Sequence, residues 1–113
     1  MSKLVDTFPI LACQVAKSLR ALGRTELARQ IDESVVSRVT FDDSVSAGYI
    51  YVEPTRALNV VEANIIGARH GETIAVETEF DAVIDTDNFE RLVGIEILAP
   101  GVLRSELKRH ASG

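Results

Sequence analysis

The sequence has one cysteine, few aromatic residues and no excess of basic charge. Because Cys13 has no partner for an internal disulfide, a scaffold held together by disulfides is excluded. A helix across a bilayer needs about 20 apolar residues in a row. No apolar run approaches that length, so we expect no membrane partner. The net charge is −5, and without clustered lysine and arginine for phosphate binding we expect no nucleic-acid partner.

Two features predict a cytoplasmic protein of bacterial type. Residues 1–11 lack the basic stretch and long apolar run of an export signal, because Asp6 and Pro9 interrupt them. Cys13 lies between Ala12 and Gln14 in a predicted helix, a position typical of a buried and unreactive thiol. An unpaired thiol also suits a reducing compartment.

What is present is the composition of one folded domain, residues 1–113. Hydrophobic residues make up 46% of the chain and charged residues 26%, which excludes a disordered protein. The charge is uneven, since residues 37–100 carry four basic and twelve acidic side chains while both ends are mildly basic. An acidic centre permits contact with a basic partner protein.

Apolar residues at helical spacing predict a helical hairpin over residues 1–36. Thr7 can cap the first helix, Pro9 lies in its first turn, and Gly23 ends it. Thr25 can cap the second helix. The apolar stripes consist of Phe8, Leu11, Val15, Leu19 and Leu22 in the first helix, and Leu27, Ala28, Ile31 and Val35 in the second. A short link that contains glycine joins the two helices as an αα-hairpin.

From residue 37 to residue 100 the hydrophobic period changes to two, which predicts a small antiparallel sheet of about four strands. We expect strands at 39–41, 48–53, 73–85 and 92–98, with turns at 42–46 and 86–89. Residues 58–62 favour a further short strand, residues 67–71 a loop with His70, and residues 101–113 a short C-terminal helix or tail. The expected fold class is α+β, with the N-terminal αα-hairpin packed on the sheet.

The last predicted strand, 92–98, carries apolar residues on both faces. Val93, Ile95 and Ile97 share one face, and Leu92 and Leu98 share the other. One helix pair covers only one face, and the edges of a small sheet also need cover. We therefore expect a homodimer, although residues 102–107 could instead fold back over Leu92 and Leu98.

Two segments in the second half of the chain form a recognisable pattern. Residues 39–43 read Val-Thr-Phe-Asp-Asp and are followed by Tyr-Ile-Tyr-Val at 49–52. Residues 84–88 read Ile-Asp-Thr-Asp-Asn and are followed by Leu-Val-Gly-Ile-Glu-Ile-Leu at 92–98. Over residues 38–98 the chain resembles the family catalogued as domain of unknown function 2283. The resemblance implies two hairpins and, since some members are encoded beside small toxin-like proteins, an antitoxin-like role, but it gives no residue a function.

Acidic residues supply the candidate metal ligands, and we interpret them as structural. The candidates are Asp42, Asp43, Asp81, Asp85, Asp87 and Glu90. A hard cation needs several oxygens that converge on one point, whereas aspartate is favoured in turns for backbone reasons. We therefore expect no metal site.

The remaining acidic residues fall within predicted strands. Glu77, Glu79 and Asp81 share one strand face, which favours a solvated surface over a binding surface. Glu96 interrupts an apolar run, and we expect it to be exposed.

No catalytic or cofactor-binding arrangement can be recognised in the sequence. Neither His70 nor His110 has a cysteine or carboxylate at ligand spacing, and Cys13 is far from both in sequence. We therefore assign no catalytic residue and no cofactor.

Residues 19–26 also resemble a helix-turn-helix, in which basic side chains would contact phosphates. These side chains are Arg20, Arg24 and Arg29. The second helix would, however, expose Glu26, Asp32 and Glu33, which repel DNA. An αα-hairpin packed on a sheet is the interpretation that the charges favour.

Three functions remain, in this order. The first is a noncatalytic protein-interaction module that self-associates. The second is an antitoxin-like or regulatory protein whose acidic sheet masks a basic partner, and the third is an enzyme whose site forms between subunits. The sequence favours a protein that is not an enzyme.

Overall fold

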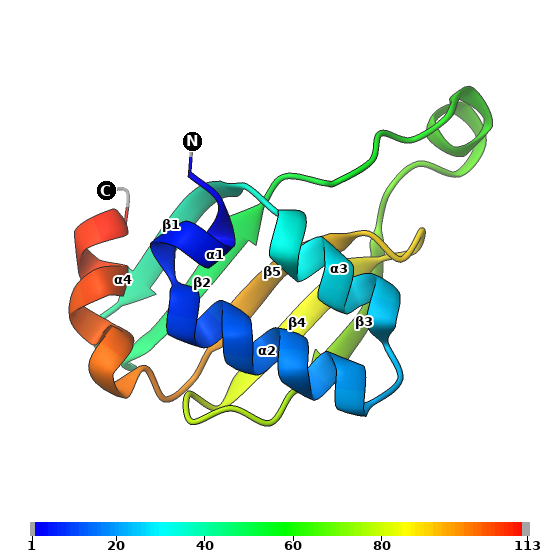
Figure 1. The fold of residues 1–113 in the computed structure, drawn as a ribbon. Coiled ribbons are helices and arrows are strands. Elements are labelled where there is room, and N and C mark those ends of the chain that lie inside the picture. Colours follow the sequence, from blue (N-terminus) through cyan, green and yellow to red (C-terminus); the bar gives the residue numbers. More distant parts are fainter. Residues whose placement is uncertain (1, 112–113) are drawn as a thin grey trace.

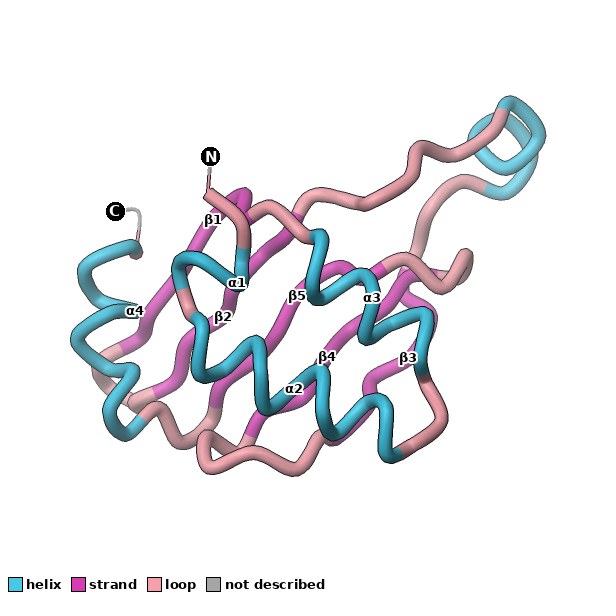
Figure 2. The backbone as a smooth tube through the Cα atoms, viewed as in Figure 1, coloured by secondary structure: helices cyan, strands magenta, loops and turns pink. Residues whose placement is uncertain are grey.

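The computed structural model describes residues 2–111, except for the side chains of residues 65 and 66. Within these residues, five strands form one antiparallel sheet. The strands are β1 (Val36–Asp42), β2 (Ala47–Val52), β3 (His70–Ala75), β4 (Ala82–Asp87) and β5 (Leu92–Ile97), in the order β1-β2-β5-β4-β3. The helices are α1 (Leu4–Thr7), α2 (Pro9–Ala21), α3 (Thr25–Glu33) and α4 (Arg104–His110), with a π-helical turn η1 (Glu62–Ile66) and a 3-10 turn η2 (Gly101–Leu103). Helices α1 to α4 lie on one face of the sheet (Figure 1 and Figure 2), which confirms the α+β class. Residues 1, 112 and 113 of the predicted single domain lie outside the described residues.

The sheet has five strands rather than about four, because the predicted strand 73–85 is a hairpin. The chain reverses between β3 and β4, where Asp81 has a positive φ of 48°. The alternation of apolar residues hides this reversal, since Val76 and Phe80 in the loop are buried like Ile74 in β3. Strand β4 also continues to Asp87, so the turn begins after Asp87 and not at residue 86 as predicted.

The connection between β2 and β3 also differs from the prediction. Residues 58–62 form no strand, because Val60 and Val61 begin a helical turn that continues as η1. The predicted loop 67–71 is shorter than expected, since His70 and Gly71 already belong to β3.

The helix starts follow the predictions only in part. Thr7 does not cap α2, because it ends α1, where its hydroxyl donates to the Lys3 carbonyl at 3.0 Å. Phe8 takes the cap position of α2, and Pro9 follows as its first residue, where a missing N–H costs little. Thr25 is likewise the first residue of α3 and not its cap.

Gly23 ends the first long helix as predicted. Its φ is 76°, and its N–H donates to the Arg20 carbonyl at 3.0 Å. The N–H of Arg24 donates to the Leu19 carbonyl at 2.8 Å, which completes a Schellman motif. Glycine adopts this positive φ without a side-chain clash, and the turn lays α3 beside α2.

One apolar core lies between the helices and the sheet. Its fully buried members include Leu11, Val15, Leu19, Ile31, Ile50, Ile84 and Ile95. Each such side chain contributes roughly 1.5–3 kcal/mol by burial.

Cys13 is exposed, contrary to the predicted buried thiol, and Leu22 at the end of the stripe is 55% exposed.

The two-faced interpretation of the last strand is wrong at Leu92. Asp85 pairs with Gly94 and Thr86 with Leu92, so Val93 is an extra residue in β5. Leu92 is only 1% exposed and belongs to the core.

A buried glutamine holds this bulged segment against α3. The side-chain oxygen of Gln30 accepts the Leu92 N–H at 2.7 Å, and its amide nitrogen donates to the Glu90 carbonyl at 3.0 Å. Leu98, by contrast, is 45% exposed beyond the end of β5. Leu92 and Leu98 therefore do not form a shared surface for a second copy.

The C-terminal helix covers a different part of the sheet from the one predicted. Helix α4 packs on β1, and the buried side chain of Leu107 lies against Gly48, so residues 102–107 do not cover Leu92 and Leu98. Ala111 then forms a parallel bridge with Val39.

The opposite end of the chain reaches the same strand. Ser2 accepts the N–H of Val36 at 2.9 Å, and Lys3 bridges to Val35. Ser2 and Lys3 near one end of the chain and Ala111 near the other therefore lie along the outer edge of β1.

Candidate functional site

The face of the sheet away from the helices, here called the open face, carries two rows of side chains. The first row is Thr40, Tyr49, Glu96, Val83 and Ala75, and the second is Arg38, Tyr51, Gly94, Asp85 and Thr73. Every member except Gly94 is half-buried or exposed. The open face therefore combines aromatic and apolar groups with charges of both signs.

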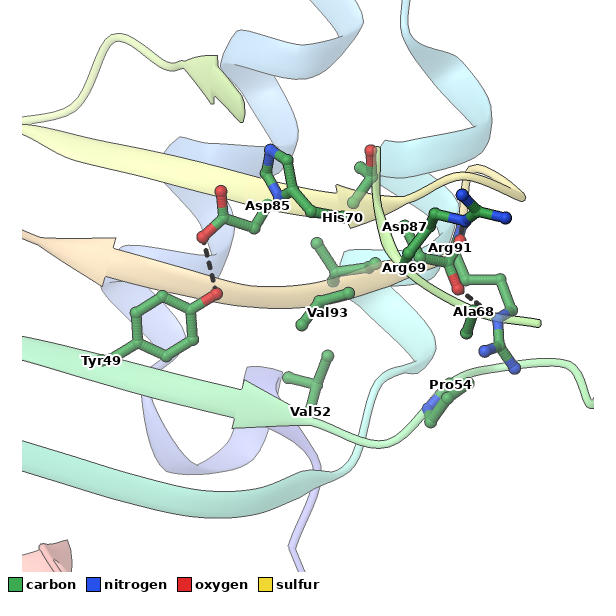
Figure 3. Close-up of a pocket in the computed structure, with 12 residues that line it drawn as sticks. Tyr49, Val52, Pro54, Ala68, Arg69, His70, Asp85, Asp87, Arg91 and Val93 are labelled. Atoms are coloured by element: carbon green, nitrogen blue, oxygen red, sulfur yellow. Dashed lines mark hydrogen bonds and ion pairs between the residues drawn. The ribbon is translucent and has the colours of Figure 1, made fainter. Parts of the chain in front are cut away.

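The second row is interrupted at Gly94, and a tyrosine ring occupies the space. A Cβ atom at Gly94 would lie 2.3 Å from Cε1 of Tyr49 and 2.6 Å from the Ile50 carbonyl oxygen. Because glycine has no side chain, the Tyr49 hydroxyl reaches across β5 and donates to Oδ2 of Asp85 at 2.7 Å (Figure 3).

Asp85 also binds a side chain of β3. Its Oδ1 accepts the hydroxyl of Thr73 at 2.7 Å, and His70 Nε2 lies 3.4 Å from the same hydroxyl. Burial raises the pKa of Tyr49, and the hydrogen bond to Asp85 raises it further. Tyr49 is thus held in its protonated form as a donor, which is the wrong state for a general base.

Aromatic contacts continue toward β1. The ring centroids of Tyr49 and Tyr51 are 4.4 Å apart, and the Arg38 guanidinium lies 5.0 Å from the Tyr51 centroid. These contacts hold the two tyrosines as a fixed pair on the open face.

A pocket of about 380 Å³ lies at the end of the sheet where β2 stops (Figure 3). Its apolar lining includes Val52, Pro54, Ala68 and Val93. Its polar lining consists of Tyr49, Arg69, His70, Asp85, Thr86, Asp87 and Arg91. No buried polar side-chain atom within residues 2–111, apart from the two side chains set aside, lacks a hydrogen-bond partner. Among these residues, the pocket therefore has no buried polar side-chain atom that needs a ligand as a partner, and its apolar walls are available for contact.

An ion pair closes the inner side of this pocket. Asp87 is buried, and its Oδ2 accepts from Nε of Arg91 at 2.7 Å, while its Oδ1 accepts the N–H groups of Phe89 and Arg91 at 2.9 Å each. Burial alone would raise the pKa of Asp87, but the backbone and side chain of Arg91 with the Phe89 N–H outweigh it and lower the pKa.

Residues 53–69, here called the arm, project beyond the sheet between β2 and β3 (Figure 1 and Figure 2). The Asn59 side chain accepts the Glu62 N–H at 2.9 Å, and the Glu62 carboxylate accepts the Asn59 N–H at 3.1 Å. This reciprocal pair is a capping box, which explains the helical turn at this position. The turn exposes Val60 by 74% and Val61 by 62%.

The base of the arm is fastened to the β4–β5 turn. Arg91 donates to the Arg56 carbonyl at 3.0 Å, and Arg56 pairs with Glu62 at 3.0 Å. On the returning side, Asn88 accepts the Arg69 N–H at 2.8 Å and donates to the Gly67 carbonyl at 3.2 Å. The arm is therefore held at both ends, next to the pocket.

The predicted metal candidates are distributed over separate turns. Asp85 and Asp87 have the partners given above, and Asp42 accepts the Ser44 N–H at 3.0 Å, in keeping with a structural role in turns. Asp43 binds Arg104 and, at 2.9 Å, Lys108. Among the described residues no three potential ligands converge on a metal position.

The predicted acidic strand face is a loop. The N–H groups of Glu77 and Glu79 donate to Ser18 at 2.8 Å and to Gln14 at 3.0 Å, so the loop is docked on α2. The carboxylates of Glu77, Glu79 and Asp81 belong to exposed residues, as a solvated surface requires. Glu96 is half-buried on the open face.

The arginines of the helical hairpin are all paired with carboxylates. Arg20 binds Asp32 at 2.7 Å, Arg24 binds Glu72 at 2.8 Å, and Arg29 binds both Glu26 and Glu33. The hairpin packs on the sheet as predicted.

Of the two histidines, His70 lies beside Thr73 on β3, and His110 contacts Phe8 with ring centroids 5.6 Å apart.

The sequence analysis did not predict the contact between Tyr49 and Asp85 on the open face, or the arm, although the sequence contains a signal for each. A glycine inside a strand pattern, as at Gly94, marks a bulge or a close approach. Asn59 with Glu62 three residues later is the spacing of a capping box.

Within the part of the chain that the structure describes, no helix is long and apolar enough to cross a membrane. No family model matches the chain, and neither a curated protein nor a solved structure is significantly similar to it. The resemblance to domain of unknown function 2283 therefore stays a prediction.

Proposed function

We propose that this protein is a noncatalytic interaction module that forms a homodimer through its open face. The observation that carries the proposal is that α1 to α4 all cover one face of the sheet and leave the other to solvent. That other face presents Tyr49, Tyr51 and Val83, and tyrosine is enriched at protein interfaces because its ring is apolar and its hydroxyl is polar.

A symmetric contact suits the charges on this face. Arg38 lies at one side of the open face and Asp85 near the other, with Glu96 between them. A twofold axis parallel to the strands brings the Arg38 side of one copy opposite the Asp85 side of the other, so these unlike charges can approach. The Glu96 side chains of the two copies lie near this axis, on the central strand β5.

The alternative functions have less support. Several acidic side chains of residues 37–100 are paired within the protein, such as Asp43, Asp87 and Glu72, which leaves less charge for a basic partner. For an enzyme, the raised pKa of Tyr49 disfavours this side chain as a general base. The two hairpins β1–β2 and β4–β5 agree with the proposed kinship to domain of unknown function 2283.

We also place the protein in the cytoplasm. The exposed, unpaired thiol of Cys13 supports this location, since such a thiol persists in a reducing compartment.

Sedimentation velocity at micromolar concentration tests the proposal. The wild type should sediment at about twice the 12.3 kDa of one chain. Val83→Lys should give a monomer with an unchanged circular dichroism spectrum, because the lysine can pair with neighbouring Glu96 in the monomer but would be buried in the dimer. Leu92 is unsuitable for this purpose, since it lies in the core.

Leu22→Lys is the matched control, because Leu22 is an exposed leucine on the helical side of the protein. This variant should remain dimeric. A wild type that sediments as a 12.3 kDa monomer would overturn the proposal. A Val83→Lys protein that dimerises like the wild type would place the interface elsewhere.

A further inference from the structure

We propose that the arm completes the dimer, with the apolar turn of each arm seated in the pocket of the second copy. This inference rests on the proposed self-association and adds the surface that recognises the partner. It joins two features, an exposed apolar turn and an apolar pocket.

The turn is built to hold its shape without packing against its own sheet. The capping box at Asn59 and Glu62 satisfies two backbone N–H groups, and Arg56 binds the same glutamate. Val60 and Val61 nevertheless remain 74% and 62% exposed. Two adjacent valines on a locally stabilised turn form a compact apolar surface that a partner can cover.

The pocket has the chemistry to receive such a turn. Val52, Pro54, Ala68 and Val93 give it apolar walls. Among its charged members, which also include Arg69, Asp85 binds Tyr49 and Asp87 binds Arg91. An apolar occupant therefore buries surface without stripping a hydrogen bond from the protein.

The position of the pocket also allows the arm of each copy to reach the pocket of the other. Pro54 and Ala68 come from the two ends of the arm itself, so the pocket lies where the arm leaves the sheet. In a twofold dimer every contact occurs twice, and an arm that reaches its partner's pocket brings its own pocket near the partner's arm.

The size of the open face gives an independent argument for the second copy. Five strands about 4.8 Å apart, each of about six residues at 3.4 Å, form a face of roughly 480 Å². A stable interface buries about 800 Å² on each partner. The accessible surface of the side chains is larger than this flat footprint, so the open face approaches such an interface, and the arm supplies additional surface at the same end of each molecule.

A double substitution in the arm tests the inference. Val60→Glu with Val61→Glu places two charges in the first turn of a helix, where they suit the helix dipole and leave the arm folded. Because two carboxylates lose their hydration when they are buried against the apolar walls of the pocket, the dimer dissociation constant should rise at least about tenfold. The matched control is Val45→Glu with Val102→Glu, since both valines are exposed, at 67% and 72%, and belong to neither the arm nor the pocket.

Cross-linking tests the contact directly. Two proteins are prepared in a Cys13→Ser background, one with Val60→Cys and the other with Val93→Cys and a tag of different mass. Val93 lines the pocket, so mild oxidation of the mixture should give the mixed disulfide dimer. The same reaction with Val45→Cys in place of Val60→Cys should give little.

The outcomes separate this inference from the proposed function. A monomeric wild type overturns both. A wild-type dimer that the arm substitutions leave unchanged, and that yields no mixed disulfide, overturns the arm contact and leaves the open-face dimer intact. Weaker association of the arm variant, with an unaffected control and a mixed disulfide, supports the inference.

Discussion

The Tyr49 hydroxyl on β2 donates to Oδ2 of Asp85 on β4 at 2.7 Å, although β5 lies between the two strands. Side chains on a sheet usually contact those of the adjacent strand. Here the missing side chain of Gly94 lets the tyrosine ring span a whole strand. Because Thr73 on β3 binds the same aspartate, the contact links β2 to β4 and β3 across the open face.

Tyr49→Phe should destabilise the protein by roughly 1–2 kcal/mol, because Asp85 loses a hydrogen bond to its charged form. Denaturant unfolding at neutral pH measures this change. A double-mutant cycle with Asp85→Asn should show that the two effects are not additive. Additive effects would mean that the contact contributes nothing to stability.

The same residue predicts how stability changes in alkali. Since the pKa of Tyr49 is higher in the folded than in the unfolded protein, its contribution is full below the unfolded value of about 10 and is lost as the pH rises above it. The free energy of unfolding should therefore fall more steeply above about pH 10 in the wild type than in Tyr49→Phe. Equal slopes for the two proteins would contradict the raised pKa.

Gly94→Ala should be more harmful than its size suggests. The new methyl group would lie 2.6 Å from the Ile50 carbonyl oxygen, and this backbone atom cannot move aside as a side chain can. We expect a loss of about 2–3 kcal/mol, near the upper range for overpacking. Gly48→Ala is the control, since its methyl group would be no closer than 3.1 Å to any neighbour and should cost much less. Similar losses in both variants would show that the space at Gly94 is not special.

Asp87→Asn should weaken the turn that holds the base of the arm. Asparagine keeps an acceptor for the Phe89 N–H, but it removes the charge that Arg91 binds, and hydrogen bonds to charged groups contribute about 1.5–3 kcal/mol. Because the pKa of Asp87 is lowered in the folded state, its contribution is full above the unfolded value of about 3.9 and is lost as the pH falls through the folded value. Acid unfolding should therefore be less steep in the variant. An identical acid profile in both proteins would contradict this assignment.

Cys13 should react with a thiol reagent in the folded protein, because it is exposed on α2. Alkylation under native conditions, followed by mass spectrometry, should show one modified cysteine without any loss of helical signal. A thiol that reacts only after denaturant is added would restore the buried position that the sequence first indicated.

The layer structure could be predicted because apolar spacing reports which side of an element is buried. Leu11, Val15 and Leu19 are all buried, as their spacing predicts. The same geometry also indicates why Cys13 is exposed, since it lies two residues from both Leu11 and Val15 and so on the other side of the helix.

The number of strands could not be predicted from alternation alone. The reversal between β3 and β4 keeps the parity of the buried residues, and Val76 and Phe80 continue the pattern of a single long strand. Leu92 was assigned to the wrong face for a related reason, since the extra residue Val93 shifts the alternation and only the neighbouring Gly94 signals the bulge. Both errors concern positions where the chain leaves regular geometry while its hydrophobic pattern continues.

The open-face site depends on a relationship between three strands. Tyr49, Gly94 and Asp85 are far apart in the sequence, and only the strand order β2-β5-β4 brings them together. A hydrophobic pattern contains no information on strand order, so this contact required the structure.

The two chain ends along β1 have a consequence for how many copies can join. Ser2 and Ala111 take backbone positions on the outer edge of that strand, and the pairing of the opposite edge strand, β3, shifts its register between His70 and Glu72. An incoming strand from another molecule therefore finds little free backbone along β1. Sideways growth into a ribbon or fibril is disfavoured at this edge, which suits the proposed face-to-face contact.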